Sequence, residues 1–253
     1  MESFAHRLAS GVRVSWASSP SFATVGTVLS TLLVLPLLDI LFDVLLGADL
    51  SAPNLVRTGY AACLVSLAVT VASGVVSAVA ADRNLGVFQE VCTLRRLDPA
   101  YWLAVSLVPL ALATVTGVLS VGAVFVLSPG HDVALLARVL LLSLGALACG
   151  VLLGVGAAGL GVSLPDPYLG ATLLASALPV LVGVIVPVSA YPAWLRVVSQ
   201  VTPLSGAVST LTAGGPALVL RDLALSAVWC AAGLVVSQVA VHRLRQGARY
   251  DIV

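Results

Sequence analysis

The sequence predicts an all-α integral membrane protein with about six transmembrane helices. Of its 253 residues, 60% are hydrophobic and only 9% are charged, which leaves too few polar side chains to cover a water-soluble fold. The apolar residues also form long runs, and one helical crossing of a bilayer core about 30 Å thick needs about 20 of them. We therefore expect residues 1–253 to form a single transmembrane domain with short loops and no separate catalytic domain.

The predicted spans are separated by short segments that contain proline, glycine or charged residues. They cover about Thr24–Leu46, Thr58–Ala81, Tyr101–Leu127, Val133–Gly161, Tyr168–Val188 and Pro216–Val241. The fourth span is rich in glycine, which favours close helix packing either within one bundle or at a subunit interface.

The arginine distribution predicts the orientation, because membrane proteins retain positively charged loops on the cytoplasmic side. If both termini are cytoplasmic, the cytoplasmic segments hold Arg7, Arg13, Arg83, Arg95, Arg96, Arg243, Arg245 and Arg249. The opposite side then holds the smaller set, Arg57, Arg138, Arg196 and Arg221. We expect a multi-pass protein of the plasma membrane, in a bacterial cell, with both termini in the cytoplasm.

Residues 1–19 precede the first span and have an amphipathic pattern. Phe4, Leu8, Val12 and Trp16 recur every four residues, and polar residues lie between them. This spacing predicts a helix that lies on the membrane surface. A polar leader without fixed structure is the alternative.

Residues 82–98 form the longest polar stretch and connect the second span to the third. Apolar residues recur every three positions within it, at Leu85, Phe88, Val91, Leu94 and Leu97. The pattern predicts a short amphipathic helix at the cytoplasmic membrane surface. Such a helix either docks on a partner or lies there without one.

In this loop the sequence resembles the permeases of the type-2 family of ABC transporters. The family's loop commonly has an acidic-basic pair, a glycine, an apolar-rich helix and a proline, and this chain has Asp82-Arg83, Gly86 and Pro99. In that family the loop contains the coupling helix, which docks in a groove of the ATPase subunit. The resemblance implies docking contacts at Leu85, Phe88, Glu90, Val91, Arg95 and Arg96. The chain departs from the pattern at Asn84 and at Val87–Gln89, where many members have more acidic residues.

Residues 189–215 are apolar but interrupted by prolines and glycines, so they predict neither a full span nor a soluble loop. They resemble the same family's segment between spans five and six, where two short helices re-enter the membrane from outside. The resemblance places Tyr191, Pro192, Trp194 and Pro203 in this external re-entrant segment. Its aromatic residues would anchor at the outer interface, and an ordinary extracellular loop is the alternative.

Ionisable residues inside the predicted spans are candidates for function, because such residues face protein or water rather than lipid. Asp39 and Asp43 are four residues apart on one face of the first span. They either line a translocation route and contact a cationic substrate, or lie hydrated near the outer membrane edge. We expect Arg221 and Asp222 to pair with charges on another helix or to extend to the membrane surface.

The sequence lacks the motifs of several enzyme classes. It contains no Gly-x-x-x-x-Gly-Lys phosphate loop, no His-Glu-x-x-His helix and no Gly-x-Ser-x-Gly turn. We therefore expect no catalytic residue, cofactor or metal in this chain. The resemblance implies that ATP and Mg bind a partner subunit. The net charge of +1 also argues against a nucleic-acid partner.

Together these features predict the transmembrane subunit of an ATP-driven exporter. The resemblance implies separate ATPase subunits, a second permease copy or a related permease, and a drug, antibiotic, lipid or glycan-like cargo. The alternative is an ATP-independent secondary transporter or channel that uses Asp39 and Asp43. A membrane anchor for another enzyme is a third hypothesis.

Overall fold

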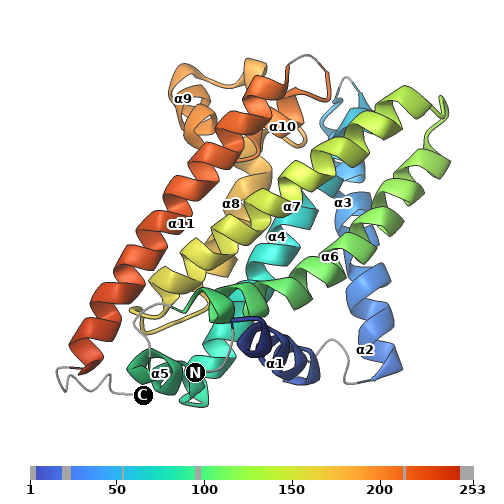
Figure 1. Ribbon diagram of the computed structural model, residues 1–253. Helices are drawn as coiled ribbons and strands as arrows, with labels where there is room; N and C mark the ends of the chain where they lie inside the picture. The colour runs from blue at the N-terminus through green and yellow to red at the C-terminus, as the bar shows by residue number, and fades with distance from the viewer. Residues whose placement is uncertain (1–3, 19–23, 53, 95–97, 213–214, 246–253) are drawn as a thin grey trace.

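The computed structural model describes residues 4–18, 24–52, 54–94, 98–212 and 215–245, with only the backbone of 92–94 and 243–245. Within these residues every regular element is helical (Figure 1). The helices are α1 (Phe4–Ser18), α2 (Val25–Leu29), α3 (Leu35–Asp49), α4 (Leu55–Asn84), α5 (Val87–Leu94), α6 (Pro99–Leu127), α7 (Val133–Gly161), α8 (Leu169–Val182), α9 (Ala193–Val201), α10 (Ser205–Ser209) and α11 (Pro216–Arg245). A π-helical stretch, Ser30–Val34, joins α2 to α3.

Five helical segments among the described residues are long and apolar enough to cross a membrane. They are Val25–Asp49, Leu55–Asn84, Pro99–Leu127, Val133–Gly161 and Pro216–His242. They correspond to five of the predicted spans and confirm an all-α membrane protein. The remaining predicted span contains α8, which has 14 residues and ends at Val182. The next residue, Gly183, caps the helix with a φ of 80°. The count of six crossings therefore stays a prediction.

α7 lies between α4 and α11, and its glycines allow both neighbours to approach closely (Figure 1). A Cβ atom at Gly150 would lie 2.7 Å from the carbonyl oxygen of Ala68 on α4. A Cβ atom at Gly159 would lie 2.4 Å from the carbonyl oxygen of Gly233 on α11. These glycines therefore serve packing inside one bundle, which is one of the two roles that the sequence left open.

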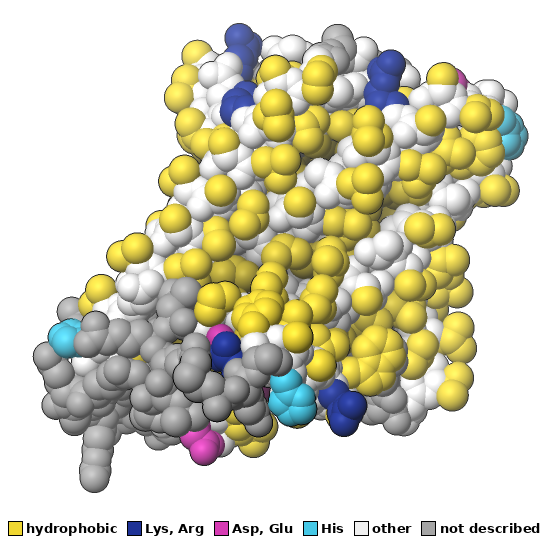
Figure 2. Space-filling view, viewed as in Figure 1, with side chains coloured by type: hydrophobic (Ala, Val, Ile, Leu, Met, Phe, Trp, Pro, Cys, Tyr) yellow, Lys and Arg dark blue, Asp and Glu magenta, His cyan; other side chains and the backbone are white. Residues whose placement is uncertain are grey.

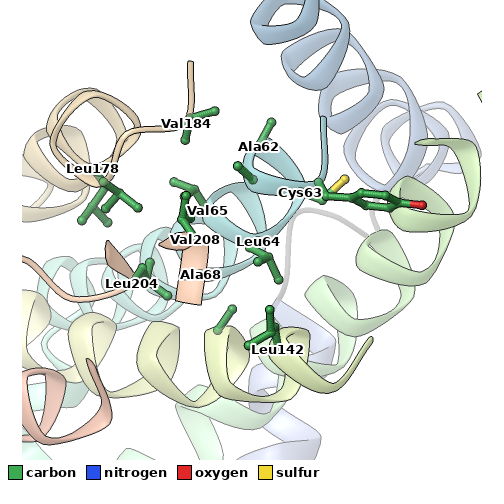
Figure 3. Close-up of a cluster of buried hydrophobic side chains, with 14 of the residues drawn as sticks. Ala62, Cys63, Leu64, Val65, Ala68, Leu142, Leu178, Val184, Leu204 and Val208 are labelled. Atoms are coloured by element: carbon green, nitrogen blue, oxygen red, sulfur yellow. The ribbon is translucent and has the colours of Figure 1, made fainter. Parts of the chain in front are cut away.

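The main buried cluster surrounds α4 and extends into the irregular segment before α11 (Figure 3). Leu142 of α7, Leu178 of α8 and Val208 of α10 all belong to this cluster. Leu204, directly before α10, is also completely buried there. The short helix α10 is therefore part of the core rather than a surface loop.

The face shown in Figure 2 has the polarity that a bilayer requires. Hydrophobic side chains cover its middle, and the charged and histidine side chains lie toward its two ends. Leucines, valines and aromatic residues of the long helices are exposed on this bundle, and such a surface is stable in lipid but not in water.

The two ends of the bundle carry different short helices (Figure 1). The α1/α5 end holds α1 and α5 beside the start of α6. The α9/α10 end holds α9 and α10 beside the start of α11. The candidate functional residues lie at these two ends and on α3.

Candidate functional site

Helix α5, within the predicted coupling loop, is held against α6 by an aromatic cluster. It begins after Gly86, whose φ of 77° turns the chain away from α4. Phe88 is only 2% exposed, and its ring centroid lies 5.9 Å from that of Tyr101 and 6.4 Å from that of Trp102. The sequence places Phe88 among the docking contacts, whereas here its ring is covered by the chain itself and fastens α5 to α6.

The other predicted docking residues are placed differently. Leu85 is 76% exposed, Glu90 is exposed, and Val91 is half-buried. Arg95 and Arg96 lie outside the described residues. Among the members of this set that the structure describes, Leu85, Glu90 and part of Val91 are therefore accessible.

Polar side chains connect the start of α6 to its neighbours at the α1/α5 end. The Tyr101 hydroxyl donates a hydrogen bond of 2.8 Å to Asp82 at the end of α4. Asp98 caps α6 by accepting from the Ala100 amide at 3.1 Å, and it forms an ion pair of 2.5 Å with Arg7 of α1. The sequence did not reveal these links, although the Tyr101-Trp102 pair, which begins two residues after Pro99, is a signal for an anchored helix start.

Arg83 adds a second connection at the same end. Its guanidinium donates to the carbonyl oxygens of Gly161 at 2.9 Å and Leu164 at 2.7 Å. These carbonyls lie at and beyond the end of α7, where a cation is favourable for the helix dipole. The ends of α4 and α7 are therefore tied together directly beside α5.

Residues 189–215 contain two short helices, α9 and α10, as the resemblance predicts. Pro192 precedes α9, Pro203 lies buried between the helices, and Trp194 is 69% exposed. Trp194, Val197, Val198 and Val201 form an exposed apolar stripe along α9. Insertion of this segment into the membrane stays a prediction.

The end of α8 is held by two side chains from elsewhere in the chain. The buried Arg57 of α4 donates to the carbonyl oxygens of Gly183 at 3.1 Å and Val184 at 3.2 Å. The Tyr191 hydroxyl donates to the carbonyl oxygen of Val180. Burial raises the pKa of Tyr191 above its ordinary value, and the nearby Arg57 charge offsets part of that rise. The sequence identified Arg57 only as a positive charge on the outer side.

The structure corrects the expectation for Asp222, whose side chain neither extends to the membrane surface nor pairs with another helix's charge. Asp222 is completely buried on α11. Its carboxylate accepts hydrogen bonds from the backbone amides of Gly206 at 3.2 Å and Ala207 at 2.8 Å, at the start of α10. The neighbouring Arg221 donates to Asp222 at 3.2 Å and to the Ser205 hydroxyl at 2.8 Å. The sequence did not reveal this contact, because its partners are backbone groups.

Asp39 and Asp43 lie on α3, the least covered of the long segments. The window that defines the Val25–Asp49 span is 11% buried, compared with 61% for Leu55–Asn84. Asp39 is exposed and Asp43 is half-buried. At 1.5 Å per residue, Asp39 lies about 3 Å along the axis from the midpoint of the span, and Asp43 about 9 Å. A hydrated position near the membrane edge therefore suits Asp43 better than Asp39.

The described residues contain no group of three or more His, Cys, Asp and Glu side chains that could hold a metal ion. The features that they do bring together are structural. At one end a short helix is fastened by aromatic rings, and at the other a core helix is capped by a buried carboxylate. Both arrangements join a short helix at one end of the bundle to a long helix.

Comparison with known families agrees with this architecture. A family model described as ABC-2 type transporter matches residues 8–214, which include α5, α9, α10 and four of the five long segments. Comparisons with curated proteins and with solved structures returned no match. The chain therefore belongs to the ABC-2 type transporter family and is a transmembrane permease subunit of an ABC transporter.

Proposed function

We propose that this permease is the membrane subunit of an ATP-driven exporter and that a separate ATPase subunit supplies the energy. The observation that carries the proposal is the arrangement of α5. Its buried face is fastened to α6 through Phe88, while Leu85 and Glu90 lie on accessible surface at the end of the bundle. A partner that moves α5 therefore moves α6 as well.

The path of this movement follows from the contacts of Tyr101. Its ring packs on Phe88 of α5, and its hydroxyl binds Asp82 of α4. Trp102 continues the aromatic cluster on α6. A displacement of α5 by ATP binding in the partner would reach two spans, α4 and α6, through these side chains. ATP and Mg would bind the partner subunit.

The α1/α5 end is the cytoplasmic end in this proposal. The sequence assigns the larger set of arginines to the cytoplasmic segments, and Arg7 and Arg13 of α1 and Arg83 at the end of α4 belong to that set. α1 lies beside α6 with Phe4 and Trp16 exposed, and Leu8 and Val12 half-buried. Exposed apolar and aromatic residues on a helix at the end of the bundle favour a position in the membrane interface. The α9/α10 end is then external, and the exposed stripe of α9 contacts the outer membrane interface.

A second permease copy, or a related permease, would complete the transport route. Asp39 lies near the middle of its span and is exposed on a single chain, and a carboxylate at that depth needs protein or water as its neighbour. A second subunit facing α3 would enclose Asp39 and Asp43 in an aqueous route. The two carboxylates favour a cargo with a positively charged group, within the drug, antibiotic, lipid or glycan-like classes implied by the resemblance.

An ATP-independent secondary transporter or channel is the second candidate, and the depth of Asp39 is the observation that favours it. In that case Asp39 and Asp43 would bind a proton or another cation, and transport would follow an ion gradient. Neutralising them would abolish transport, and changes on α5 would have little effect.

Co-purification tests the exporter proposal and locates the docking surface. The wild-type protein, extracted in mild detergent, is expected to bring down a subunit that binds and hydrolyses ATP. Leu85→Asp should lose this subunit, because it places a charge in the accessible apolar part of the surface. Val133→Asp is the matched control, since Val133 is 67% exposed at the opposite end.

The outcomes separate the candidates. An ATPase recovered with the wild type and Val133→Asp but not with Leu85→Asp supports docking on the α5 surface. Equal recovery of the ATPase with the wild type and both variants contradicts docking on that surface. Failure to recover any ATPase with folded wild-type protein contradicts the exporter proposal and favours tests of ion-driven transport.

A further inference from the structure

Asp222 is a completely buried ionisable residue that the proposed transport scheme does not yet use. A carboxylate inside a membrane protein is costly unless hydrogen-bond donors surround it. Here the donors are the amides of Gly206 and Ala207 and the guanidinium of Arg221. Two of the three belong to the start of α10, so the burial of Asp222 depends on where α10 lies.

The turn that leads into α10 is strained. Leu204 has a φ of 73°, in the left-handed region that a branched, bulky side chain rarely adopts. Its side chain is nevertheless completely buried in the core, together with Val208 (Figure 3). A conformation of this kind persists only where surrounding interactions hold it. The carboxylate of Asp222 supplies such interactions two and three residues further along the chain.

Gly206 shows that the contact between α10 and α11 has no spare room. A Cβ atom at this position would lie 2.5 Å from the carbonyl oxygen of Leu218 and 2.9 Å from Oδ2 of Asp222. Only glycine therefore allows the start of α10 to reach the backbone of α11. Three independent features, the carboxylate, the strained turn and this close approach, meet at one place.

We propose that Asp222 is a positioning residue that holds α10 in a closed position on α11, and that α10 leaves this position when the transporter opens at its α9/α10 end. Because the turn at Leu204 is strained, breaking the carboxylate contacts favours release of α10 over small adjustments. Two discrete arrangements of a packed element are the usual basis of such switching. The link to opening rests on the proposed export function, whereas the closed position of α10 does not.

The accessibility of a cysteine at Val208 measures how often α10 leaves its position. Val208 is completely buried, and cysteine has nearly the same size. The reporter Val208→Cys is made in a variant with Ala at the four native cysteines, and the permease alone is labelled in membranes with an impermeant maleimide. Asp222→Asn should increase the labelling rate about tenfold or more, since it removes a charge-assisted contact. An unchanged rate overturns the proposal.

A second reporter separates release of α10 from general loosening of the fold. Val139 of α7 is also completely buried, and Val139→Cys should be labelled at the same slow rate with either residue at position 222. If Asp222→Asn accelerates labelling equally at both positions, Asp222 only stabilises the fold and the proposal is overturned.

A glycine at position 204 tests the role of strain. Leu204→Gly and Leu204→Ala both remove the buried side chain, but only glycine adopts the left-handed conformation without cost. In the Asp222→Asn background, labelling at position 208 should be about fivefold slower with glycine than with alanine. Equal rates would show that Asp222 does not hold a strained turn.

Gly206→Ala keeps the experiment decisive if Asp222→Asn does not fold. This variant retains Asp222 but forces α10 away from Leu218, so it should also accelerate labelling. Gly215→Ala is the matched control, because a Cβ atom there meets nothing within 4 Å. Slow labelling in Gly206→Ala, equal to that of the control, overturns the proposal. The experiment needs no ATPase, so its result is independent of whether the proposed export function holds.

Discussion

Gly159 of α7 faces Gly233 of α11 so closely that a Cβ atom on Gly159 would lie 2.4 Å from the Gly233 carbonyl oxygen. Two helices pack this closely in a membrane only where small residues meet. Between helices in lipid, van der Waals packing replaces the hydrophobic effect as the attractive force. The contact joins the last span, which lies beyond the family match, to the rest of the bundle. Its loss should therefore separate α11 from α7.

Gly159→Val should destabilise the protein by about 1–3 kcal/mol, as overpacking does, or prevent folding. Thermal unfolding in detergent, followed by tryptophan fluorescence, measures the change. Gly122→Ala serves as the control, because a Cβ atom at Gly122 meets nothing within 4 Å. Equal melting temperatures for Gly159→Val and wild type would contradict the helix contact.

Phe88→Ala should separate ATPase binding from transport. The substitution removes a buried ring that fastens α5 to α6, and loss of a buried Phe side chain costs about 3–5 kcal/mol. Leu85 and Glu90 remain on the surface, so the ATPase still binds with reduced affinity while its hydrolysis no longer drives transport. Phe88→Leu should retain most of the coupling. If Phe88→Ala transports like the wild type, the aromatic cluster is not the connection.

Arg57→Lys should lower stability by about 1–3 kcal/mol, since an ammonium group cannot reproduce the two guanidinium hydrogen bonds to Gly183 and Val184. The melting temperature in detergent is the measurement. Arg138→Lys, on the exposed surface of α7, is the control and should leave it unchanged. A melting temperature equal to that of the control would mean that Arg57 does not hold the end of α8.

Asp39→Asn should reduce export of a positively charged cargo by about tenfold without changing recovery of the ATPase, because the charge lies on α3 and not near α5. Asp132→Asn is the control, since Asp132 is exposed and caps α7, and asparagine caps helices equally well. If the wild type instead transports along an ion gradient without ATP, and Asp39→Asn loses this transport, the secondary transporter is favoured.

Hydropathy was sufficient to predict the five long spans, because length and apolar composition alone decide whether a helix crosses a bilayer. The end of α8 was harder to predict from the sequence. Gly183 ends the helix in a left-handed conformation, and Arg57 caps it from α4, a contact between residues more than 100 positions apart. Local sequence pattern does not contain that contact, so the predicted span, about Tyr168–Val188, extends beyond the helix, which is Leu169–Val182.

For the candidate residues, too, the sequence predicted the local helix but not its long-range contacts. The three-residue spacing of 82–98 predicted α5, but it could not say which face meets α6, because the bundle and a partner are both apolar neighbours. Phe88 consequently lies inside, although its type and position suit docking equally well. The burial of Asp222 was not predictable, because its donors are backbone amides 15 and 16 residues away.

The most direct test of the export proposal is the ATPase activity of the complex in proteoliposomes. The wild-type and Val133→Asp permeases should alter the rate of ATP hydrolysis by the partner subunit, whereas Leu85→Asp should leave the partner at its isolated rate. If no ATP-hydrolysing partner assembles with the folded wild-type permease, or if Leu85→Asp alters the rate as the wild type does, then ATP-driven coupling through the α5 surface is contradicted.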